Sequence, residues 1–344
     1  MFSDRHAVRL PSSAPPRLVA LVDVEEEFDW DADFDRGATR FAHLDELEQG
    51  LDALAGVDIV PVGVITYPVV EDDAVAARLE RWVADGRMIV GAHLHPWVTP
   101  PYDEVVDRRN SFPGNLPKEL EGAKLAALTA RLEERVGERP RVYQAGRYGA
   151  GPNTAALLAA EGYTVGMSVN PPFDFSPQGG PDYSREGATP FWHGERSALL
   201  ELPITGAFVG WAGAGGGRML HRLAATDAMT RARLGGLLAR VRAVERIRLS
   251  PEGQSLADMQ RLTRALLARG ERVFVLSFHS PSLAPGCTEY VRDAEEREAF
   301  LARCTGYARW FVETIGGETS TPLEVRETLL REAPPPTPRG EAIA

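Results

Sequence analysis

The chain has 344 residues and a mass of 37.5 kDa, a length that suits one large domain or two ordinary ones. Its 38 Lys and Arg residues against 49 Asp and Glu residues give a formal net charge of −11. The electrostatic field of a protein with this negative charge repels phosphate backbones and anionic lipids, which argues against a nucleic-acid partner. With 44% hydrophobic and 25% charged residues, the composition is typical of a globular protein.

Short apolar runs alternate with helical patterns along the chain, the order expected for parallel strands joined by crossover helices. Apolar residues at helical spacing predict a helix over 41–54 and a second one that runs through Leu79 and Trp82 and ends at Gly86. Further helices are predicted over 120–136, 152–162, 218–245 and 253–269, and two more near the C-terminus. The last of these opens with the capping box Thr321-Pro322-Leu323-Glu324. Strands are predicted at 18–24, 59–66, 88–95, near 142, and at 164–169, 199–204 and 273–279.

The sequence predicts a single folded domain with short flanking segments. Residues 1–16 are expected to be flexible, 17–332 to form the domain, and 333–344, with three successive prolines, to be disordered. The first 16 residues lack the apolar core of a secretory signal, and no uncharged apolar run reaches about 18 residues. We therefore expect a soluble cytoplasmic protein without a membrane-spanning segment.

Ionisable residues collect at the carboxyl ends of three predicted strands. Side chains on a strand alternate between its two faces, so each of these strands has one wholly apolar face. The other face turns ionisable only at the end of the strand, with Asp23 and Glu25 on the first, His93 and His95 on the third, and His279 on the last. A β/α barrel with its chemistry at the carboxyl mouth explains this pattern, and an open doubly wound sheet explains it equally well.

Two carboxylates and several imidazoles at one mouth are suitable ligands for a divalent metal such as Zn²⁺, Co²⁺, Ni²⁺ or Fe²⁺. Zinc can lower the pKa of a bound water to about 7, a second carboxylate can take the proton, and an imidazole can protonate a departing amine. Each group alone also has a structural interpretation. An Asp-x-Glu pair is often a solvated rim or a helix cap, and paired histidines can be hydrogen-bonded core side chains.

Four segments in this order resemble the polysaccharide deacetylases of the NodB-homology superfamily, carbohydrate esterase family four, and especially its WalW-like branch. They are residues 22–26, 91–97, 145–149 and 276–280, and the resemblance spans 17–285. It implies a distorted (β/α)7 barrel that removes N-acetyl groups from amino sugars with a divalent metal, with zinc favoured. By position in the family's motifs, Asp23 would be the catalytic base, Glu25 and His93 metal ligands, and His279 the general acid.

The chain departs from the family pattern at three positions. The family's second metal histidine lies four residues past the first, where this chain has Trp97, so His95 is expected to replace it. Because the first segment reads Asp-x-Glu-Glu, either Glu25 or Glu26 could be the metal ligand, and strand phase favours Glu25. Gln144 stands where we expect the family's arginine.

Residues 147 and 148 follow directly in the third of these segments. Arg147 is a candidate to hold the base in its charged form. Tyr148, together with Trp97, is a candidate for stacking against a sugar ring, and core packing is the alternative for both aromatic residues.

The leading hypothesis is a metal-dependent hydrolase that cleaves an N-acetyl amide on an amino sugar. In the cytoplasm its substrate would be a nucleotide-linked or lipid-linked sugar, or another precursor of an envelope polysaccharide. Two alternatives remain. The chain could hydrolyse another C–N bond, such as a cyclic amide, or it could be a non-catalytic glycan-binding homologue.

Overall fold

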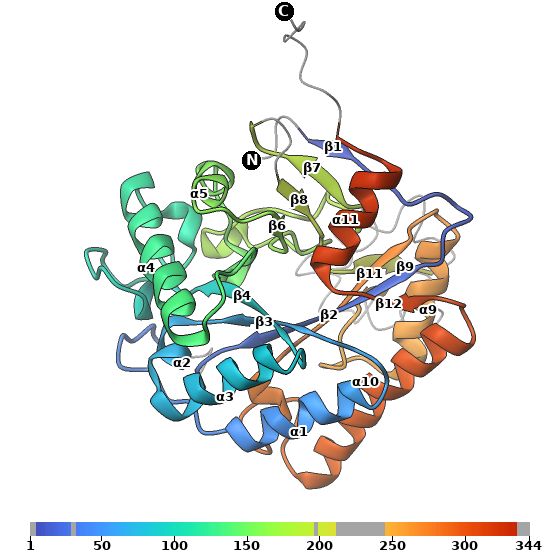
Figure 1. The fold of residues 1–344 in the computed structure, drawn as a ribbon, viewed down its shortest axis with the longest axis horizontal. Coiled ribbons are helices and arrows are strands. Elements are labelled where there is room, and N and C mark those ends of the chain that lie inside the picture. Colours follow the sequence, from blue (N-terminus) through green and yellow to red (C-terminus); the bar gives the residue numbers. More distant parts are fainter. Residues whose placement is uncertain (1–4, 29–31, 196–198, 211–244, 336–344) are drawn as a thin grey trace, which may run out of the picture.

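The computed structural model describes residues 5–28, 32–195, 199–210 and 245–335. Its strands are β1 (His6–Ala7), β2 (Arg17–Val24), β3 (Val62–Ile65), β4 (Ile89–Leu94), β5 (Val142–Ala145), β6 (Val165–Gly166), β7 (Phe191–His193), β8 (Leu199–Glu201), β9 (Gly206–Val209), β10 (Glu245–Arg248), β11 (Val273–His279) and β12 (Glu318–Thr319). In the described part of the chain, the main sheet runs β1-β7-β8-β6-β5-β4-β3-β2-β11, with β12 also on β2 and a separate β9–β10 pair (Figure 1).

Seven strands of the main sheet run parallel: β2, β3, β4, β5, β6, β8 and β11. No ladder joins the two ends of this series, β8 and β11, among the described residues. Irregular segments fill the seam instead, where Thr205 Oγ1 accepts a hydrogen bond from Val275 N at 2.8 Å and Leu249 O accepts one from Ser277 N at 3.1 Å. The expected distorted barrel is confirmed, and the open doubly wound sheet is excluded.

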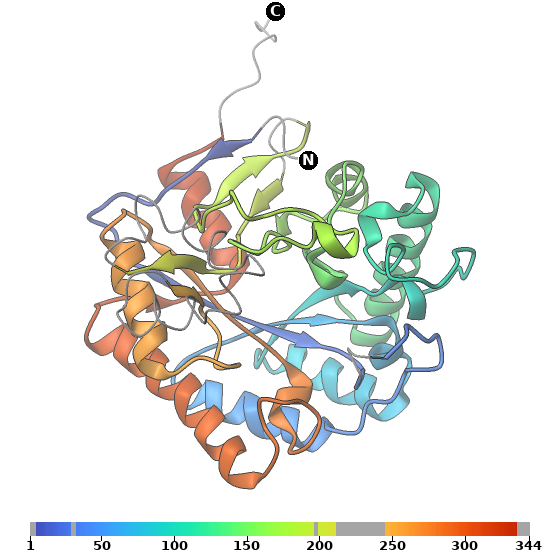
Figure 2. The same cartoon turned by 180° about the vertical axis from the view of Figure 1, so that it is seen from behind.

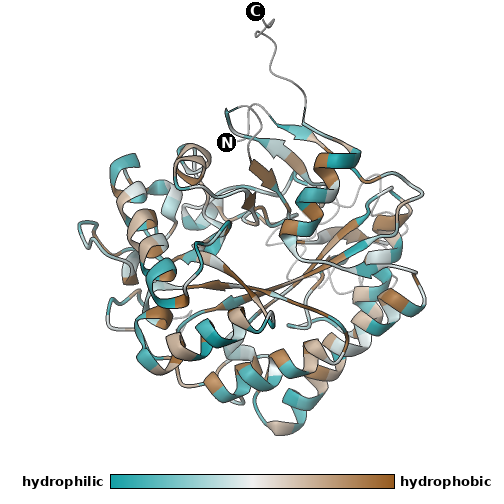
Figure 3. Cartoon of the chain, viewed as in Figure 1, coloured by the Kyte–Doolittle hydropathy of each residue, from teal (hydrophilic) through white to brown (hydrophobic). Residues whose placement is uncertain are grey.

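Helices cover the outer face of this sheet (Figure 1). Leu47, Leu51 and Leu54 are buried at helical spacing in the first of them, and most of the predicted helices are confirmed. Colouring by hydropathy places brown on the central strands and mixed colours on the helices around them (Figure 3). The described helices are α1 (Leu44–Ala55), α2 (Tyr67–Glu71), α3 (Asp73–Ala84), α4 (Lys118–Val136), α5 (Thr154–Ala160), α9 (Leu256–Leu267), α10 (Ala294–Glu313) and α11 (Pro322–Glu332).

The two faces of β2 belong to different cores, as strand alternation requires. Leu18 and Ala20 pack under the outer helices, whereas Val19 and Leu21 belong to the inner core of the barrel. Helix α11 contributes Val325 and Leu329 to that inner core, and β12 just before it pairs with the first residues of β2. Helix α11 therefore closes the amino-terminal end of the barrel and leaves the carboxyl ends of the strands for a site.

Several terminal and loop segments differ from the expectations. The described part of segment 1–16 packs on the sheet, because β1 pairs with β7 and both Val8 and Leu10 are buried; Figures 1 and 2 both show β1 beside β7. The β9–β10 pair was not predicted. Residues 218–244 of one predicted helix and most of the expected tail lie outside the described residues. None of the described helices combines the length and the apolar character needed to cross a lipid bilayer.

Candidate metal centre and catalytic site

The parallel register brings the predicted site residues to one edge of the sheet. Asp23 on β2 lies opposite His279 on β11, and His93 on β4 lies opposite Gln144 on β5. His279 Nε2 is 3.5 Å from Asp23 Oδ2. Residues far apart in sequence thus meet where the strands end, because neighbouring parallel strands end at the same edge.

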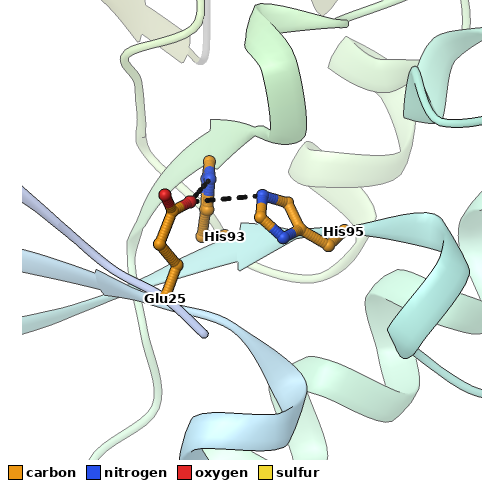
Figure 4. Close-up of side chains that lie close together, drawn as sticks. All are labelled: Glu25, His93 and His95. Atoms are coloured by element: carbon orange, nitrogen blue, oxygen red, sulfur yellow. Dashed lines mark ion pairs between the residues drawn. The ribbon is translucent and has the colours of Figure 1, made fainter. Parts of the chain in front are cut away.

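Glu25, His93 and His95 form a cluster with the composition of a metal site. The Glu25 carboxylate oxygen Oε2 lies 3.5 Å from His93 Nε2 and 3.4 Å from His95 Nε2 (Figure 4). One ligand atom from each residue lies within 4.8 Å of the others, and all three side chains are buried. Within the described residues this is the one such group of three metal-binding side chains.

Both imidazoles are oriented by their other ring nitrogen. His93 Nδ1 lies 3.2 Å from the backbone oxygen of Gln144, and His95 Nδ1 lies 2.7 Å from Glu26 Oε1. Both Nε2 atoms face Glu25, and with the proton on Nδ1 the His95 ring presents a lone pair there, the arrangement usual for histidines that bind metals. Glu26 therefore supports His95, whereas Glu25 faces both rings, and strand phase had favoured Glu25 as the ligand.

The electrostatics of the cluster also fit a cation. Burial, together with the nearby His95, lowers the pKa of His93 to about 3, so this ring is neutral and able to bind metal. Although burial disfavours a charged ring, Glu26 and Glu25 raise the pKa of His95. The buried acids thus favour positive charge at this position, which a bound cation would also supply. The residues present therefore fit a divalent metal.

Close packing fixes the backbone around His95. A Cβ atom on Gly146 would lie 2.3 Å from the Leu94 carbonyl oxygen and 2.7 Å from the His95 ring, so this position requires glycine. On the other side, the buried Lys124 of α4 donates to the backbone oxygens of Pro96, Thr99 and Pro101. The segment that follows His95 is therefore held by three hydrogen bonds from one side chain.

Asp23 is buried beside the cluster and has an amide partner. The side-chain amide of Gln144 lies 3.0 Å from both Asp23 carboxylate oxygens, and with its nitrogen on that side it donates to both. Burial raises the pKa of Asp23, and His279 and His93 oppose that rise. A carboxylate with a raised pKa is better able to accept a proton near neutral pH.

His279 is paired with a glutamate, Glu252, that no motif or period in the sequence marks. Its Nδ1 lies 3.0 Å from both oxygens of Glu252, which in turn receives Arg248 at 3.3 Å and the Ser282 hydroxyl at 2.8 Å. Although burial opposes both charges, the pair lowers the pKa of Glu252 to about 2 and raises that of His279 to about 10. His279 is therefore a cation at neutral pH and can donate a proton.

Two predicted residues, Arg147 and Trp97, lie in other environments than expected. Arg147 donates to Ser111 Oγ and to Gln178 and does not pair with Asp23, so it is not the charge partner of the base. Trp97 is 1% exposed and stacks on the His95 ring with centroids 4.3 Å apart, which makes it a support for that ring and not a face for a sugar. Tyr148 is half-buried, and its hydroxyl accepts from Arg248 at 3.4 Å.

His43 is a further buried histidine near the site, which the strand pattern does not mark. It is 1% exposed, and its two ring nitrogens contact Glu27 Oε1 at 3.1 Å and Ser280 Oγ at 2.7 Å. Ser280 directly follows His279 and accepts a long hydrogen bond, 3.4 Å, from the backbone nitrogen of Glu25. No periodicity in the sequence marks either His43 or Glu252, because both lie outside regular strands.

Comparison with protein-family models and with curated proteins finds no match. Among solved structures, a protein from Mycobacterium smegmatis provisionally named a polysaccharide deacetylase matches with a TM-score of 0.51 and 13% identity, covering 98% of this chain and 100% of its own. Two other structures are more distant. A 4-alpha-glucanotransferase from Thermococcus litoralis has a TM-score of 0.49 and 10% identity, covering 91% of this chain and 40% of its own. A CE4 esterase from Streptococcus mutans has a TM-score of 0.43 and 14% identity, covering 90% of this chain and 87% of its own. The chain therefore shares the fold of the polysaccharide deacetylase structure.

Proposed function

We propose that the chain is a metal-dependent hydrolase that removes the N-acetyl group from an amino sugar. The observation that carries the proposal is the placement of Asp23 and His279, 3.5 Å apart, directly beside the Glu25, His93 and His95 cluster. A base, an acid and a set of metal ligands therefore converge on one mouth of the barrel. The four sequence segments that resemble the NodB-homology deacetylases and their WalW-like branch support the same function.

Asp23 and His279 are placed for the two proton transfers that amide hydrolysis needs. A divalent metal, for which we propose zinc, would polarise the acetyl carbonyl and make a water more acidic when held by Glu25, His93 and His95. Asp23 takes a proton from the water as the water oxygen forms a bond to the carbonyl carbon. His279 Nε2 then donates its proton to the amine nitrogen as the C–N bond breaks, which yields acetate and the free amino sugar.

Buried supports keep these groups in position before substrate binds. Gln144 holds Asp23, Glu252 holds His279, and Glu26 holds His95. Fixed hydrogen bonds of this kind lower the reorganisation needed during reaction. We place the enzyme in the cytoplasm, where its substrate would be a precursor of a polysaccharide.

An acetate-release assay tests the proposal. Purified protein would be supplied with N-acetylated mono- and oligosaccharides, nucleotide-linked sugars and lipid-linked sugars, with and without added Zn²⁺. We expect metal-dependent acetate release. Asp23→Asn should abolish this release without changing the metal content, whereas the control Asp85→Asn, at an exposed residue, should leave it unchanged. If no sugar releases acetate from metal-loaded protein, the proposed function is wrong. If the reconstituted protein holds almost no transition metal and His93→Ala leaves that content unchanged, the glycan-binding alternative is favoured.

A further inference from the structure

Strand β10 carries two arginines next to the candidate active site. Arg246 and Arg248 are two residues apart, so their side chains leave the same face of the strand. On the neighbouring strand β9, Phe208 and Gly206 are their respective partners in the ladder. The two guanidinium groups therefore lie side by side on one surface of the β9–β10 pair.

Arg248 connects this surface to the catalytic residues. One of its terminal nitrogens lies 3.3 Å from Glu252 Oε2, and the other donates to the Tyr148 hydroxyl at 3.4 Å. Glu252 is the partner of His279. Because Glu252 compensates the charge of Arg248, this arginine is a structural part of the site and offers little net charge to a ligand.

Arg246 differs from Arg248 because its charge has no carboxylate partner within the described residues. It is exposed, and its guanidinium carbon lies 4.1 Å above the ring of Phe173. Stacking on an aromatic ring leaves the edge of the guanidinium, with its N–H donors, available to a ligand. The position is therefore cationic, oriented and open.

A row of aromatic rings connects Arg246 with the catalytic residues. Phe173 stacks with Phe175 at a centroid distance of 6.2 Å, and Phe175 stacks with Tyr148 at 5.7 Å, with interplanar angles of 17° and 27°. All three rings are partly exposed. Tyr148 is also the hydroxyl partner of Arg248, so the row and the two arginines form one continuous wall beside His279 and Glu252.

The segment that carries Phe173 also contains an unsatisfied amide. Asn170 is 1% exposed, and within the described residues neither its side-chain nitrogen nor its oxygen has a hydrogen-bond partner. The carbonyl of the next residue, Pro171, lies 2.2 Å from where a Cβ on Gly206 would be, so this segment passes directly beside β9. A buried amide without a partner is costly, and a polar ligand or water is its usual complement.

We propose that Arg246 binds an anionic group, a phosphate ester or a carboxylate, carried by the amino sugar whose acetamide is hydrolysed. This inference rests on the proposed function and names its substrate class. A planar guanidinium can hold two oxygens of either anion at once. In a chain with a net charge of −11, an arginine without a carboxylate partner in the described part of the chain supplies local attraction for an anion that the rest of the molecule repels.

Binding measurements on inactive protein test this inference without relying on turnover. Metal-loaded Asp23→Asn protein would be titrated calorimetrically with N-acetylglucosamine, its 1-phosphate, and N-acetylmuramic acid, which carries a carboxylate. We expect at least one anionic sugar to bind about tenfold or more tightly than the neutral sugar, a typical value for one charge-assisted contact. The sugar that binds more tightly, the phosphate or the carboxylate, shows which anionic group the substrate carries.

Variants of Arg246 then assign the preference to this side chain. Adding Arg246→Gln should reduce anionic binding to the level of the neutral sugar, and Arg246→Lys should retain part of the preference. Arg264→Gln is the matched control, because Arg264 is also exposed and stacks on an aromatic ring, 5.0 Å from the centroid of Trp310, on the outer helices. The Arg264→Gln variant should bind the anionic sugars as tightly as the protein without this change.

Two outcomes would overturn the inference. One is equal affinity for the neutral and anionic sugars, and the other is an anion preference that Arg246→Gln leaves intact. Acetate release by otherwise unaltered protein, with and without Arg246→Gln, separates this failure from that of the proposed function. Acetate released equally from neutral and anionic sugars refutes the role of Arg246 alone, whereas no acetate from any sugar refutes the proposed function.

Discussion

His279 Nδ1 lies 3.0 Å from both carboxylate oxygens of Glu252, and the same carboxylate accepts the backbone N–H of His279 at 2.9 Å. Glu252 therefore fixes the backbone and the ring of His279 together. It also provides the largest favourable contribution to the charge of His279, whose pKa rises to about 10 despite burial. The proposed acid is thus protonated throughout the neutral range.

Replacing Glu252 by Gln should move the alkaline limb of activity to lower pH. Hydrolysis requires His279 protonated, below its pKa, and Asp23 ionised, above its pKa. Loss of the Glu252 charge lowers the pKa of His279, so the proton donor is lost at a lower pH, and kcat should fall about 10- to 100-fold. The pH profile of kcat/KM for acetate release measures this shift. Glu201→Gln, at another buried glutamate, is the control, and an unmoved alkaline limb would contradict the role of Glu252.

Glu26→Gln should weaken metal binding without removing a ligand. Its carboxylate holds His95 Nδ1 at 2.7 Å, and the loss of such a support typically weakens metal affinity by about 10- to 100-fold. Competition with a chelator, followed by elemental analysis, measures the change. Glu121→Gln is the control, since Glu121 is another buried glutamate, on α4, that accepts a hydrogen bond from the Thr154 hydroxyl. Equal affinity in both variants would count against the metal site.

Strand phase predicted the meeting of five residues because their positions depend on regular structure. Asp23, His93 and His279 lie at the ends of parallel strands, and Glu25 and His95 follow in the same phase. The register of a parallel sheet then places them together, whatever the sequence separation. The resemblance to a known family added roles to these positions, which the assays above would test.

Residues in irregular segments could not be placed in this way. Arg147 and Tyr148 have left-handed backbone conformations, with φ of 54° and 59°, so strand alternation does not apply to them. The Arg147 guanidinium instead lies 4.1 Å above the ring of Phe112. Trp97 lies in a short 3₁₀ turn, Pro96–Val98, that brings its ring onto His95. In each case a turn sets the direction of the side chain. Turns do not repeat with a regular period in the sequence, so this direction could not be predicted.

Gln144→Glu should inactivate the enzyme near neutral pH while leaving the fold intact. The Gln144 amide lies 3.0 Å from both oxygens of Asp23, so a carboxylate there would face a second carboxylate. Like charges at this distance raise the pKa of one group, and a protonated Asp23 cannot accept a proton. The acid limb of the kcat/KM profile should therefore move to higher pH. Gln144→Leu removes the donor without adding charge, and an equal acid limb in both variants would exclude the electrostatic explanation.

Ser280, His43 and Glu27 have the order of a serine-hydrolase triad, with contacts of 2.7 Å and 3.1 Å between successive side chains. Ser280, however, has 0% of its surface exposed, so an acyl group cannot reach its hydroxyl without a change in the fold. Its hydroxyl also accepts the backbone N–H of Glu25. The arrangement therefore supports the backbone of the metal cluster, and its resemblance to a triad is geometric alone.

Ser280→Ala should lower stability more than activity. Removing the hydroxyl leaves buried His43 and the Glu25 amide without this partner, which costs about 1–3 kcal/mol of unfolding free energy, measurable by urea denaturation. Acetate release at saturating metal should stay within about tenfold of the unaltered protein, whereas loss of a serine nucleophile costs about 10⁶-fold in kcat. Thr263→Ala, which removes another buried hydroxyl at a distance from the strand ends, is the control for stability. A covalent acyl adduct on Ser280, detected by mass spectrometry during turnover, would replace the metal-dependent mechanism with a serine mechanism.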